Sequence, residues 1–434
     1  MRRTQLTLAL LASLSIASAT AELQTPLDPA DYRLDQLGLM QGHPPPADKQ
    51  VTAANYLMQF PNLRWAFHHM RELLPSRNIH RAGKPVQPWP QGTDQHSQID
   101  ALRFDGPDGE ALSFADYLSR TYADATLILH NGEVIYEAYH EGMPAHHPHM
   151  LWSVTKSFTG LLATQLIHEG VLDADALVTD YLPELAESGW QGASVQQVLN
   201  MTADIDYNEI YGDEKSNVLE YAMAANMAPA PADFTGYRNL TDYLPSIGRG
   251  PGEHGREFVY RTVHTEVLGW VLRRASQQSV SELISERLWQ QLGAEHDAYL
   301  LLDSKGTEWA GAGLNVTLRD LARIGELMRN QGNWQGNQVI APEVVETITN
   351  GADREAFKAS GRDFMPGFSY RNQWWISHDN DGSYYALGVH GQMIHVNPST
   401  NTVVVRFSSH PEASSAVTML YTLPAMAALA DYLR

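Results

Sequence analysis

The sequence predicts a mixed α+β fold, in which an antiparallel sheet is flanked by helices and carries a helical insert. Residues 125–140 alternate between apolar and polar positions, as strands do, whereas apolar positions follow a helical period through much of residues 153–365. Beyond about residue 365 the period of two returns. We expect the early and late strands to form one antiparallel sheet, with the helical insert beside it.

The length of 434 residues is enough for a large core and two or three structural units. We divide the chain by composition and pattern. The expected parts are a signal peptide (1–21), an N-terminal extension (22–100) and a main domain (101–434), with its sheet part at about 101–150 and 365–434 and its helical part at about 153–365.

The composition excludes several classes of function. A formal net charge of −20 argues against binding to nucleic acid or to anionic membrane surfaces. The chain has no cysteine, which excludes a disulfide framework, a cysteine nucleophile and a thiolate metal site.

The N-terminus has the pattern of a signal peptide. Two arginines at positions 2 and 3 precede an apolar run at 6–16, and a small-x-small site at 19–21 precedes Glu22. The alternative is a membrane anchor, but this run is too short to span a bilayer, and we find no later stretch long enough. We therefore predict a cleaved signal peptide, a periplasmic or secreted protein, and no stable membrane insertion.

The extension contains a helical pattern at 53–74 that Pro61 interrupts, and no chemistry is evident in it. The first strands follow at 125–130 and 133–140. Asn131-Gly132 lies between them and favours a type I′ turn, because both residues tolerate positive φ angles.

A histidine-rich loop follows this hairpin. Its histidines are irregularly spaced around two prolines, which favours a polar loop over a metal site, and we expect no metal. The four residues are His140, His146, His147 and His149.

Residues 151–160 contain a Ser-x-x-Lys at the start of an amphipathic helix that ends near Gly170. If the helix begins at Ser153, Lys156 lies one turn later on the same face. Unpaired N–H groups at a helix N-terminus stabilise a developing oxyanion, so Ser153 has the surroundings of an acyl-transfer nucleophile. The alternative is a capped helix with a solvated lysine, and the spacing alone leaves both open.

The rest of the chain supplies the elements around this helix. We expect helices at 195–201, 265–276, 279–292 and 317–330, strands at 383–389, 392–396 and 402–407, and a C-terminal helix at 415–433 interrupted at Pro424. The serine then lies where the sheet meets the helical insert, a place where pockets form.

Two other motifs can be set aside. Residues 250–255 match Gly-x-Gly-x-x-Gly but neither follow a clear strand nor open a clear helix, so a dinucleotide site is not expected. No Gly-x-Ser-x-Gly nucleophile elbow occurs.

Several segments in this order resemble the serine β-lactamase and penicillin-binding-protein superfamily. Within it the chain is most similar to the class C-like serine hydrolases, and specifically to the 6-aminohexanoate-dimer hydrolase group. The segments that carry the resemblance are residues 152–160, 198–202, 258–262, 266–270 and 388–392.

The resemblance implies roles for named residues. Ser153 would be the nucleophile, Lys156 would take its proton, and Tyr260 would be the second acid/base group. The backbone N–H groups of Ser153 and Gln392 would form the oxyanion hole. An acyl-Ser153 would then be hydrolysed by water, with no metal or organic cofactor.

The chain departs from the superfamily pattern at two motifs. Val389-His390-Gly391 replaces Lys-Thr-Gly, so the cation that holds a β-lactam carboxylate is missing, although His390 could partly replace it. Thr262 stands where the Tyr-x-Asn motif has its asparagine. Both departures favour a carboxylesterase or linear-amide hydrolase, with His390 and Gly391 as candidate substrate contacts.

The segment 204–213 lies where that group has a substrate-covering loop, which makes Tyr207 and Tyr211 further candidate contacts. Its carboxylates could meet a substrate ammonium, or could be solvated. We therefore expect an exported amidase or esterase acting on a small molecule. The alternatives are a β-lactamase or D,D-peptidase and a non-catalytic binding protein, and the oligomeric state stays open.

Overall fold

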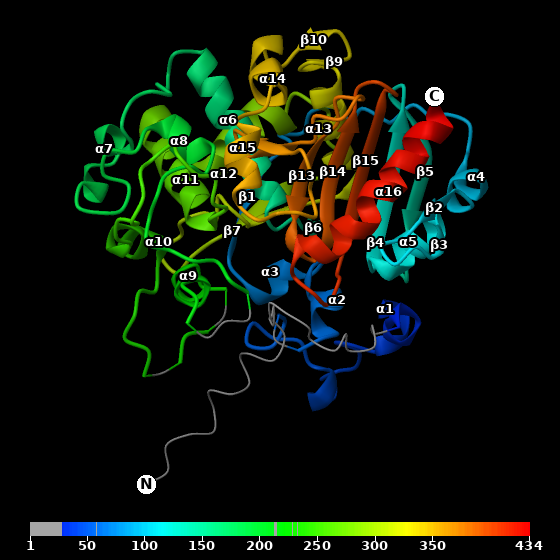
Figure 1. Cartoon of the computed structure of the whole chain (residues 1–434). Coiled ribbons are helices and arrows are strands. Elements are labelled where there is room, and N and C mark those ends of the chain that lie inside the picture. The colour runs from blue at the N-terminus through cyan, green and yellow to red at the C-terminus, as the bar shows by residue number, and fades with distance from the viewer. Residues whose placement is uncertain (1–27, 58, 212–214, 228, 232) are drawn as a thin grey trace.

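The structure is a computed structural model that describes residues 28–434 except 58, 212–214, 228 and 232. The predicted signal peptide at 1–21 lies outside the described residues, as does Asp213 of the predicted loop. Figure 1 shows the sheet with α16 in front of it and the helical part to one side.

A seven-stranded antiparallel sheet forms the centre of the molecule, in the order β11-β12-β13-β14-β15-β4-β5 (Figure 1). Strand β15 pairs with β4, with Thr402 opposite His130, so the late and early strands form one sheet as predicted. The bounds are β4 (Ala123–His130), β5 (Glu133–Tyr139), β11 (Ser369–Arg371), β12 (Trp374–Ile376), β13 (Tyr384–Gly388), β14 (Gln392–Asn397) and β15 (Thr402–Ser408).

The predicted hairpin between β4 and β5 is confirmed. Asn131 and Gly132 have φ angles of 53° and 80°, both in the left-handed region that a type I′ turn requires. The amide of Asn131 also donates to the carbonyl of Asn401 at 2.9 Å, which ties this turn to the one before β15.

Helices cover both faces of the sheet. On one face, α13 (Leu318–Arg329) packs on β4, β14 and β15, and Gly325 allows this approach, since a Cβ there would lie 2.4 Å from a Val403 side-chain atom. On the other face, α5 (Phe114–Arg120) and α16 (Ser415–Leu433) pack on one another. The sheet separates two hydrophobic cores, one on each face. Leu127 and Ile128 are neighbours in β4 but belong to different cores, because successive side chains of a strand point to opposite faces.

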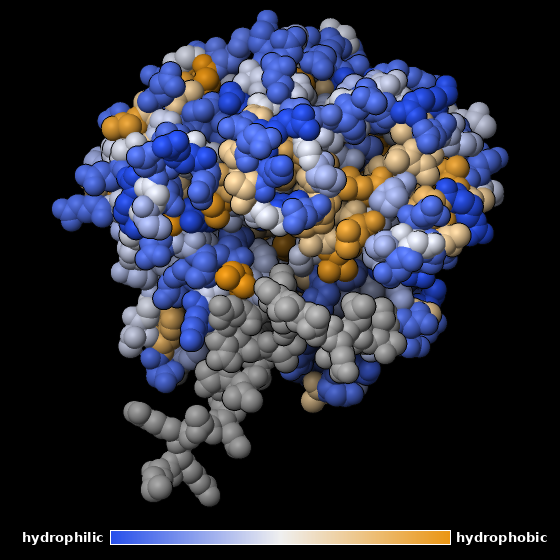
Figure 2. All heavy atoms as spheres, viewed as in Figure 1, coloured by the Kyte–Doolittle hydropathy of each residue, from blue (hydrophilic) through white to orange (hydrophobic). Residues whose placement is uncertain are grey.

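Helix α16 corrects two expectations. It continues through Pro424 instead of breaking there. The Leu420 carbonyl, which loses its N–H partner at this proline, belongs to a residue that is 46% exposed and can be hydrated. The helix is also long and apolar enough to cross a bilayer, although its inner side packs within the domain. Figure 2 shows apolar side chains along its visible face.

A second, four-stranded sheet was not predicted, because its strands are only two to four residues long. Its order is β1-β7-β8-β6, and it joins the N-terminal extension to the main domain through the pairing of β1 with β7. Strand β6 leads directly to Ser153. The bounds are β1 (Ser76–Ile79), β6 (His149–Met150), β7 (Ala298–Leu301) and β8 (Leu314–Val316), and two further pairs are β2 (Arg103–Asp105) with β3 (Ala111–Ser113) and β9 (Asn333–Trp334) with β10 (Asn337–Gln338).

The remaining elements are helices and helical turns, of which α6 and α11 are the longest at 15 residues each. The extension contains η2 (Pro29–Tyr32), α1 (Leu34–Leu37), η3 (Ala47–Lys49), α2 (Asn62–Ala66), α3 (Met70–Leu73) and α4 (His96–Asp100). The rest contains α6 (Val154–His168), α7 (Val178–Tyr181), η4 (Pro183–Leu185), α8 (Val195–Leu199), α9 (Val218–Ala224), α10 (Leu240–Tyr243), η5 (Leu244–Ser246), α11 (Thr262–Ser276), α12 (Val280–Ile284), the π-helical η6 (Ser285–Trp289), α14 (Pro342–Thr349), α15 (Arg354–Lys358) and η7 (Val389–Gly391).

The predicted helices at 195–201, 265–276 and 317–330 are present within a few residues of their bounds. The helix predicted at 279–292 is split into α12 and the π-helical η6, although its capping box at Ser279 is formed. The pattern at 53–74 gives only α2 and α3, which both follow Pro61.

Candidate active site

Ser153 is the N-cap residue of α6 and is 7% exposed. The preceding Trp152 has a φ of 48°, which is uncommon for a large side chain and turns the chain sharply from β6 into the helix. Its ring packs against Phe67 and His390, with centroid distances of 5.6 and 5.7 Å, and these contacts hold the unusual conformation. Ser153 is thus presented at a rigid turn.

Lys156 is buried one helical turn after the serine, so it is not a solvated surface lysine. Its Nζ donates to Ser153 Oγ at 2.9 Å and to the Gly311 carbonyl at 2.8 Å. Burial lowers the pKa of Lys156 to about 8, while the negative charges of Glu209 and Glu266 act in the opposite direction. An amine with this pKa is partly neutral near pH 8 and can accept the serine proton.

Glu266 holds the backbone that Lys156 contacts. Its carboxylate accepts hydrogen bonds from the amides of Ala310 at 2.9 Å and Gly311 at 3.1 Å. The Tyr221 hydroxyl donates to it at 2.7 Å. Burial raises the pKa of Glu266 to about 7, against the effect of these bonds and of the Lys156 charge. Gly311 therefore connects the two side chains, because its N–H donates to Glu266 and its carbonyl accepts from Lys156.

Neither of these two contacts was predicted from the sequence. Glu266 belongs to a segment that carried the family resemblance, but no role was assigned to it. No sequence motif singled out Gly311. The structure shows why a glycine stands there, because a Cβ would lie 2.9 Å from both a Glu266 oxygen and a Thr262 methyl carbon.

Tyr260 lies beside the serine and lysine. Its ring centroid is 5.3 Å from Lys156 Nζ, and the ring stacks on Trp375 at 5.4 Å. Burial raises the pKa of Tyr260, and a hydrogen bond with Ser153 opposes this shift. The phenol is therefore protonated at neutral pH and placed to give a proton to a group bound at Ser153.

Ser153 opens onto two cavities of about 130 and 150 Å³. Both are also lined by Glu209, Tyr211 and Val389. The first is mostly apolar and includes side chains from the extension, where no chemistry was expected. Its further lining includes Ala53, Tyr56, Leu57, Met223 and Ala413.

The second cavity is bordered by Tyr260, Trp375 and Arg362. The Arg362 guanidinium lies over the rings of Tyr260 and Trp375, at 5.3 and 5.4 Å from their centroids. None of the carboxylates that the structure describes forms an ion pair with it. A larger hollow of about 1050 Å³, lined by Arg77 and Glu282 among others, contains none of these groups.

Glu209 is the carboxylate shared by both cavities. It accepts from the Thr262 amide at 2.5 Å and the Thr262 hydroxyl at 2.7 Å, and from the Tyr211 hydroxyl at 2.8 Å. The Thr262 bonds place it at the start of α11, where the helix dipole favours a negative charge. From the sequence, Glu209 was one of the loop carboxylates that could meet a substrate ammonium or be solvated.

The structure separates the four predicted substrate contacts into two pairs. His390 and Tyr211 line the apolar cavity with Ser153, whereas Gly391 and Tyr207 are not among the described residues that line either cavity. Tyr207 is buried, and its carbonyl accepts from Arg261 Nε at 2.9 Å.

The expectation that His390 supplies a cation is wrong. Burial lowers the pKa of His390 to about 4, so its ring is neutral at physiological pH. The ring is also held by a 2.7 Å hydrogen bond between Nδ1 and the His410 carbonyl. Burial of this kind is not visible in the sequence, where the residue stands in the place of a lysine or threonine.

Gln392 begins β14 directly after the turn that contains His390. At the other end of this turn, Gly388 packs closely on the chain before Ser153, because a Cβ there would lie 2.5 Å from the Leu151 carbonyl. The side chain of Gln392 is occupied by the backbone of Ser408, to which its amide donates at 2.5 Å. The turn therefore lies against the segment that carries Ser153.

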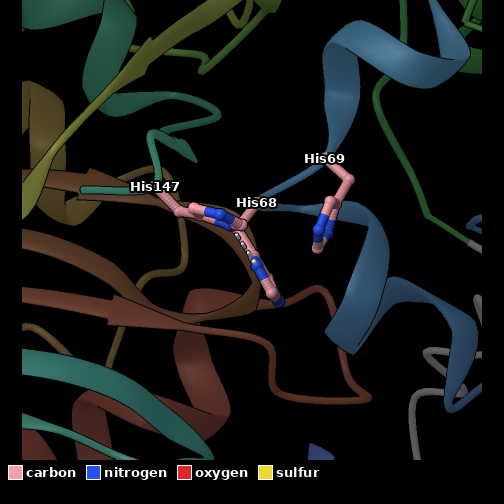
Figure 3. A group of neighbouring side chains, drawn as sticks. All are labelled: His68, His69 and His147. Atoms are coloured by element: carbon pink, nitrogen blue, oxygen red, sulfur yellow. Dashed lines mark hydrogen bonds between the residues drawn. The ribbon is translucent and has the colours of Figure 1, made fainter. Parts of the chain in front are cut away.

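The histidine-rich loop does not act as one unit. His149 is buried, and its Nε2 lies 3.2 Å from a carboxylate oxygen of Asp124. His147 instead approaches two histidines of the extension, His68 and His69 (Figure 3).

The family comparison agrees with this geometry. The family model described as Beta-lactamase matches residues 114–423, and the chain belongs to this family. It is a serine hydrolase with the mixed α+β fold of the group.

Within the family the chain is similar to 6-aminohexanoate-dimer hydrolases. It is 37% identical to the 6-aminohexanoate-dimer hydrolase of Paenarthrobacter ureafaciens over 357 residues, which is 81% of this chain and 86% of the relative. A solved structure from Bacillus anthracis, named as a candidate 6-aminohexanoate-dimer hydrolase, matches with a TM-score of 0.80 and 29% identity over 90% of this chain and 98% of the other.

A more distant solved structure shares the fold. EstCE1, a hydrolase with promiscuous acyltransferase activity, matches with a TM-score of 0.56 and 17% identity, over 70% of this chain and 93% of the other.

Proposed function

We propose that the protein is an exported hydrolase of linear amides or esters that works through an acyl-enzyme on Ser153. The observation that carries this proposal is the 2.9 Å hydrogen bond between buried Lys156 and Ser153, together with the lysine pKa of about 8. A serine next to an amine that can lose its proton is an activated nucleophile.

In the first half of the proposed reaction, the Ser153 Oγ–H proton passes to Lys156 Nζ while the oxygen attacks the substrate carbonyl carbon. The oxyanion accepts hydrogen bonds from the backbone amides of Ser153 and Gln392. Tyr260 then gives its proton to the leaving nitrogen or oxygen and regains one from Lys156, and the scissile bond breaks. Water completes the reaction by attacking the acyl-Ser153 ester, with the proton steps reversed.

The charges of the cavities favour a linear substrate with ionised ends. Glu209 offers a carboxylate to an ammonium group, and Arg362 offers a guanidinium without a described ionic partner to a carboxylate. The apolar cavity suits a methylene chain. An amide of ω-amino acids has all three features, as does the 6-aminohexanoate dimer cleaved by the relative. The neutral His390 gives no support for a β-lactam carboxylate site.

A labelling experiment tests the nucleophile. A fluorophosphonate probe should add one adduct mass to the wild-type protein and none to Ser153→Ala. Ser157→Ala is a matched control, because this serine lies in the same helix with its Oγ bonded to the Gln373 carbonyl at 2.8 Å. No adduct on the wild type would contradict the proposed nucleophile and favour the binding-protein alternative. An adduct on Ser153→Ala would show that the probe labels a different nucleophile.

A substrate panel tests the class of bond. We expect turnover of 6-aminohexanoate dimer and short p-nitrophenyl esters and slow or no turnover of nitrocefin under the same conditions. Rapid nitrocefin hydrolysis would instead favour a β-lactamase. Export is tested separately by the intact mass of the protein recovered outside the cytoplasm, which should begin at Glu22.

A further inference from the structure

We propose that His68, His69 and His147 form a binding site for a transition-metal dication such as Zn²⁺, separate from the serine site. Figure 3 shows the three side chains next to one another, two from the extension and one from the loop before β6. One possible ligand nitrogen from each residue lies within 4.8 Å of the other two. Imidazole nitrogens are preferred ligands of zinc, copper and nickel.

The spacing of the first two rings fits a shared metal better than a hydrogen bond. The Nδ1 atoms of His68 and His147 face one another at 3.3 Å, which is long for a nitrogen hydrogen bond. Two nitrogens that each lie about 2.0–2.1 Å from one tetrahedral zinc are themselves separated by about 3.3 Å. The observed distance therefore also fits two ligands of one ion.

The third ring is already in the tautomer that a metal requires. His69 Nδ1 lies 2.8 Å from the Trp65 carbonyl, so Nδ1 carries the proton and Nε2 keeps its lone pair. A ligating histidine commonly donates its other N–H to a backbone carbonyl in this way. The ring stacks on Trp65 at 4.0 Å and is half-buried. The limit of 4.8 Å within the group exceeds the nitrogen spacing on a tetrahedral zinc, about 3.3 Å, by about 1.5 Å.

His68 gives an independent reason to expect an ion. Its side chain is 6% exposed, and its Nε2 has no hydrogen-bond partner among the described residues. The long contact with His147 is thus the one hydrogen bond that this buried ring forms within the described part of the chain. A buried polar ring normally has stronger partners, and an ion bound at Nδ1 would replace this long contact with a coordinate bond while Nε2 keeps the proton.

The site would connect the extension to the catalytic segment. The Met150 amide donates to the carbonyl of Phe67 at 2.7 Å, and the Phe67 ring packs against Trp152, the neighbour of Ser153. His69 and His147 are half-buried, so solvent can supply the fourth ligand. A three-histidine ion with one water is a common zinc arrangement.

Zinc titration of the full mature chain after EDTA treatment tests the proposal. By isothermal titration calorimetry we expect one Zn²⁺ per chain in the wild type. His69→Gln and His147→Gln should weaken binding by at least about 10- to 100-fold, which is the loss caused even by removing partners outside the ligand shell. His168→Gln is the matched control, because this histidine is exposed at the end of α6.

Thermal unfolding gives a second measurement. Zinc should raise the midpoint of the wild type and of His168→Gln, because an ion that binds only the folded state stabilises it. The midpoints of His69→Gln and His147→Gln should not change, while their circular dichroism without zinc matches the wild type. No zinc binding to the wild type, or wild-type affinity in either variant, overturns the proposed site.

Discussion

Two buried cations of this molecule are neutralised in different ways. Arg64 is fully buried and lies 3.1 Å from an oxygen of Asp124 and 2.8 Å from one of Glu141. Lys156 is equally buried, but it donates hydrogen bonds to a hydroxyl and a backbone carbonyl, and the charges of Glu209 and Glu266 act on it through space. The ion pairs of Arg64 hold its charge in place. Lys156 has no such ion pair, so its amine can exchange a proton with Ser153.

The pKa values follow this difference. Arg64, His149 and Ser409 all contact Asp124, and their combined effect exceeds the burial penalty and lowers its pKa to about 2. Around Lys156 burial dominates and lowers the pKa to about 8. Direct ion pairs thus surround Arg64 and Asp124, whereas Lys156, for which we propose a catalytic role, has none among the described residues.

The largest expected effect comes from removing Lys156, the proposed base. Lys156→Ala should lower kcat/KM for a p-nitrophenyl ester by at least about 10³-fold, because the serine loses its base. Lys156→Arg should be about as inactive, since a guanidinium keeps the charge but cannot accept a proton. Steady-state kinetics on folded variants measures both. Near-normal turnover by the arginine variant would show that the positive charge, and not proton transfer, is what matters.

Breaking the network of Arg64 and Asp124 should instead lower the unfolding free energy of the protein. Asp124→Ala leaves the buried Arg64 charge with only the half-buried Glu141 as a partner, and loss of a buried partner costs about 3–5 kcal/mol of unfolding free energy. Denaturant unfolding measures this loss, and Lys156→Ala is the contrasting control, because it removes a buried charge that has no direct ionic partner. A larger destabilisation by Lys156→Ala than by Asp124→Ala would contradict the distinction between the networks.

The Asp124 network should also give acid sensitivity. The folded pKa of about 2 lies below the ordinary value of 3.8, so ionised Asp124 contributes stability above about pH 4. This contribution is lost as the pH falls from about 4 towards 2. Unfolding free energies measured across this range should fall less steeply in Asp124→Asn than in the wild type, and equal slopes would exclude the network as the cause.

Arg362 is a half-buried cation, for which we propose that the substrate supplies the partner. Arg362→Gln should raise KM about 10- to 100-fold for an amide with a free carboxylate, the loss of one charge-assisted hydrogen bond. The change should be much smaller for a neutral ester of the same chain length. Arg371→Gln, at the end of β11, is the control. An equal rise in KM for both substrates would indicate that Arg362 positions the Tyr260 ring and does not bind the carboxylate.

The smallest effect is expected at Glu266, which acts as a positioning residue through Gly311. Its charge raises the pKa of Lys156, so Glu266→Gln should move the acid limb of the kcat/KM profile to lower pH. Glu308→Gln is a matched control, because this buried carboxylate also accepts two backbone amides, those of Val280 and Ser281. A shift in the control alone, or in neither variant, would contradict the assigned role.

Local patterns predicted the parts of the site that lie close together in sequence. Ser153 and Lys156 are three residues apart on one helix, and Asn131-Gly132 fixes the hairpin by its own backbone preferences. The late strands were visible because they alternate over five to seven residues.

Contacts between distant residues were not predictable in this way. Lys156 and Gly311 are separated by 155 positions, and His68 and His147 by 79. A single sequence shows the residue types but not which of them meet. The same limit explains the error at His390, whose charge is decided by burial among residues from other parts of the chain.

The pairing of β15 with β4 has a consequence for biosynthesis. His130 leaves the ribosome about 270 residues before its partner Thr402, which at roughly 5–20 residues per second is a delay of about 14–54 seconds. During this time one edge of the hairpin has no neighbour, and such an edge can pair with other chains. The nucleophile helix is also made before the strands that carry the opposite wall of its cavity. The nascent enzyme is therefore inactive, and its β4 edge unprotected, until almost the whole chain has been translated.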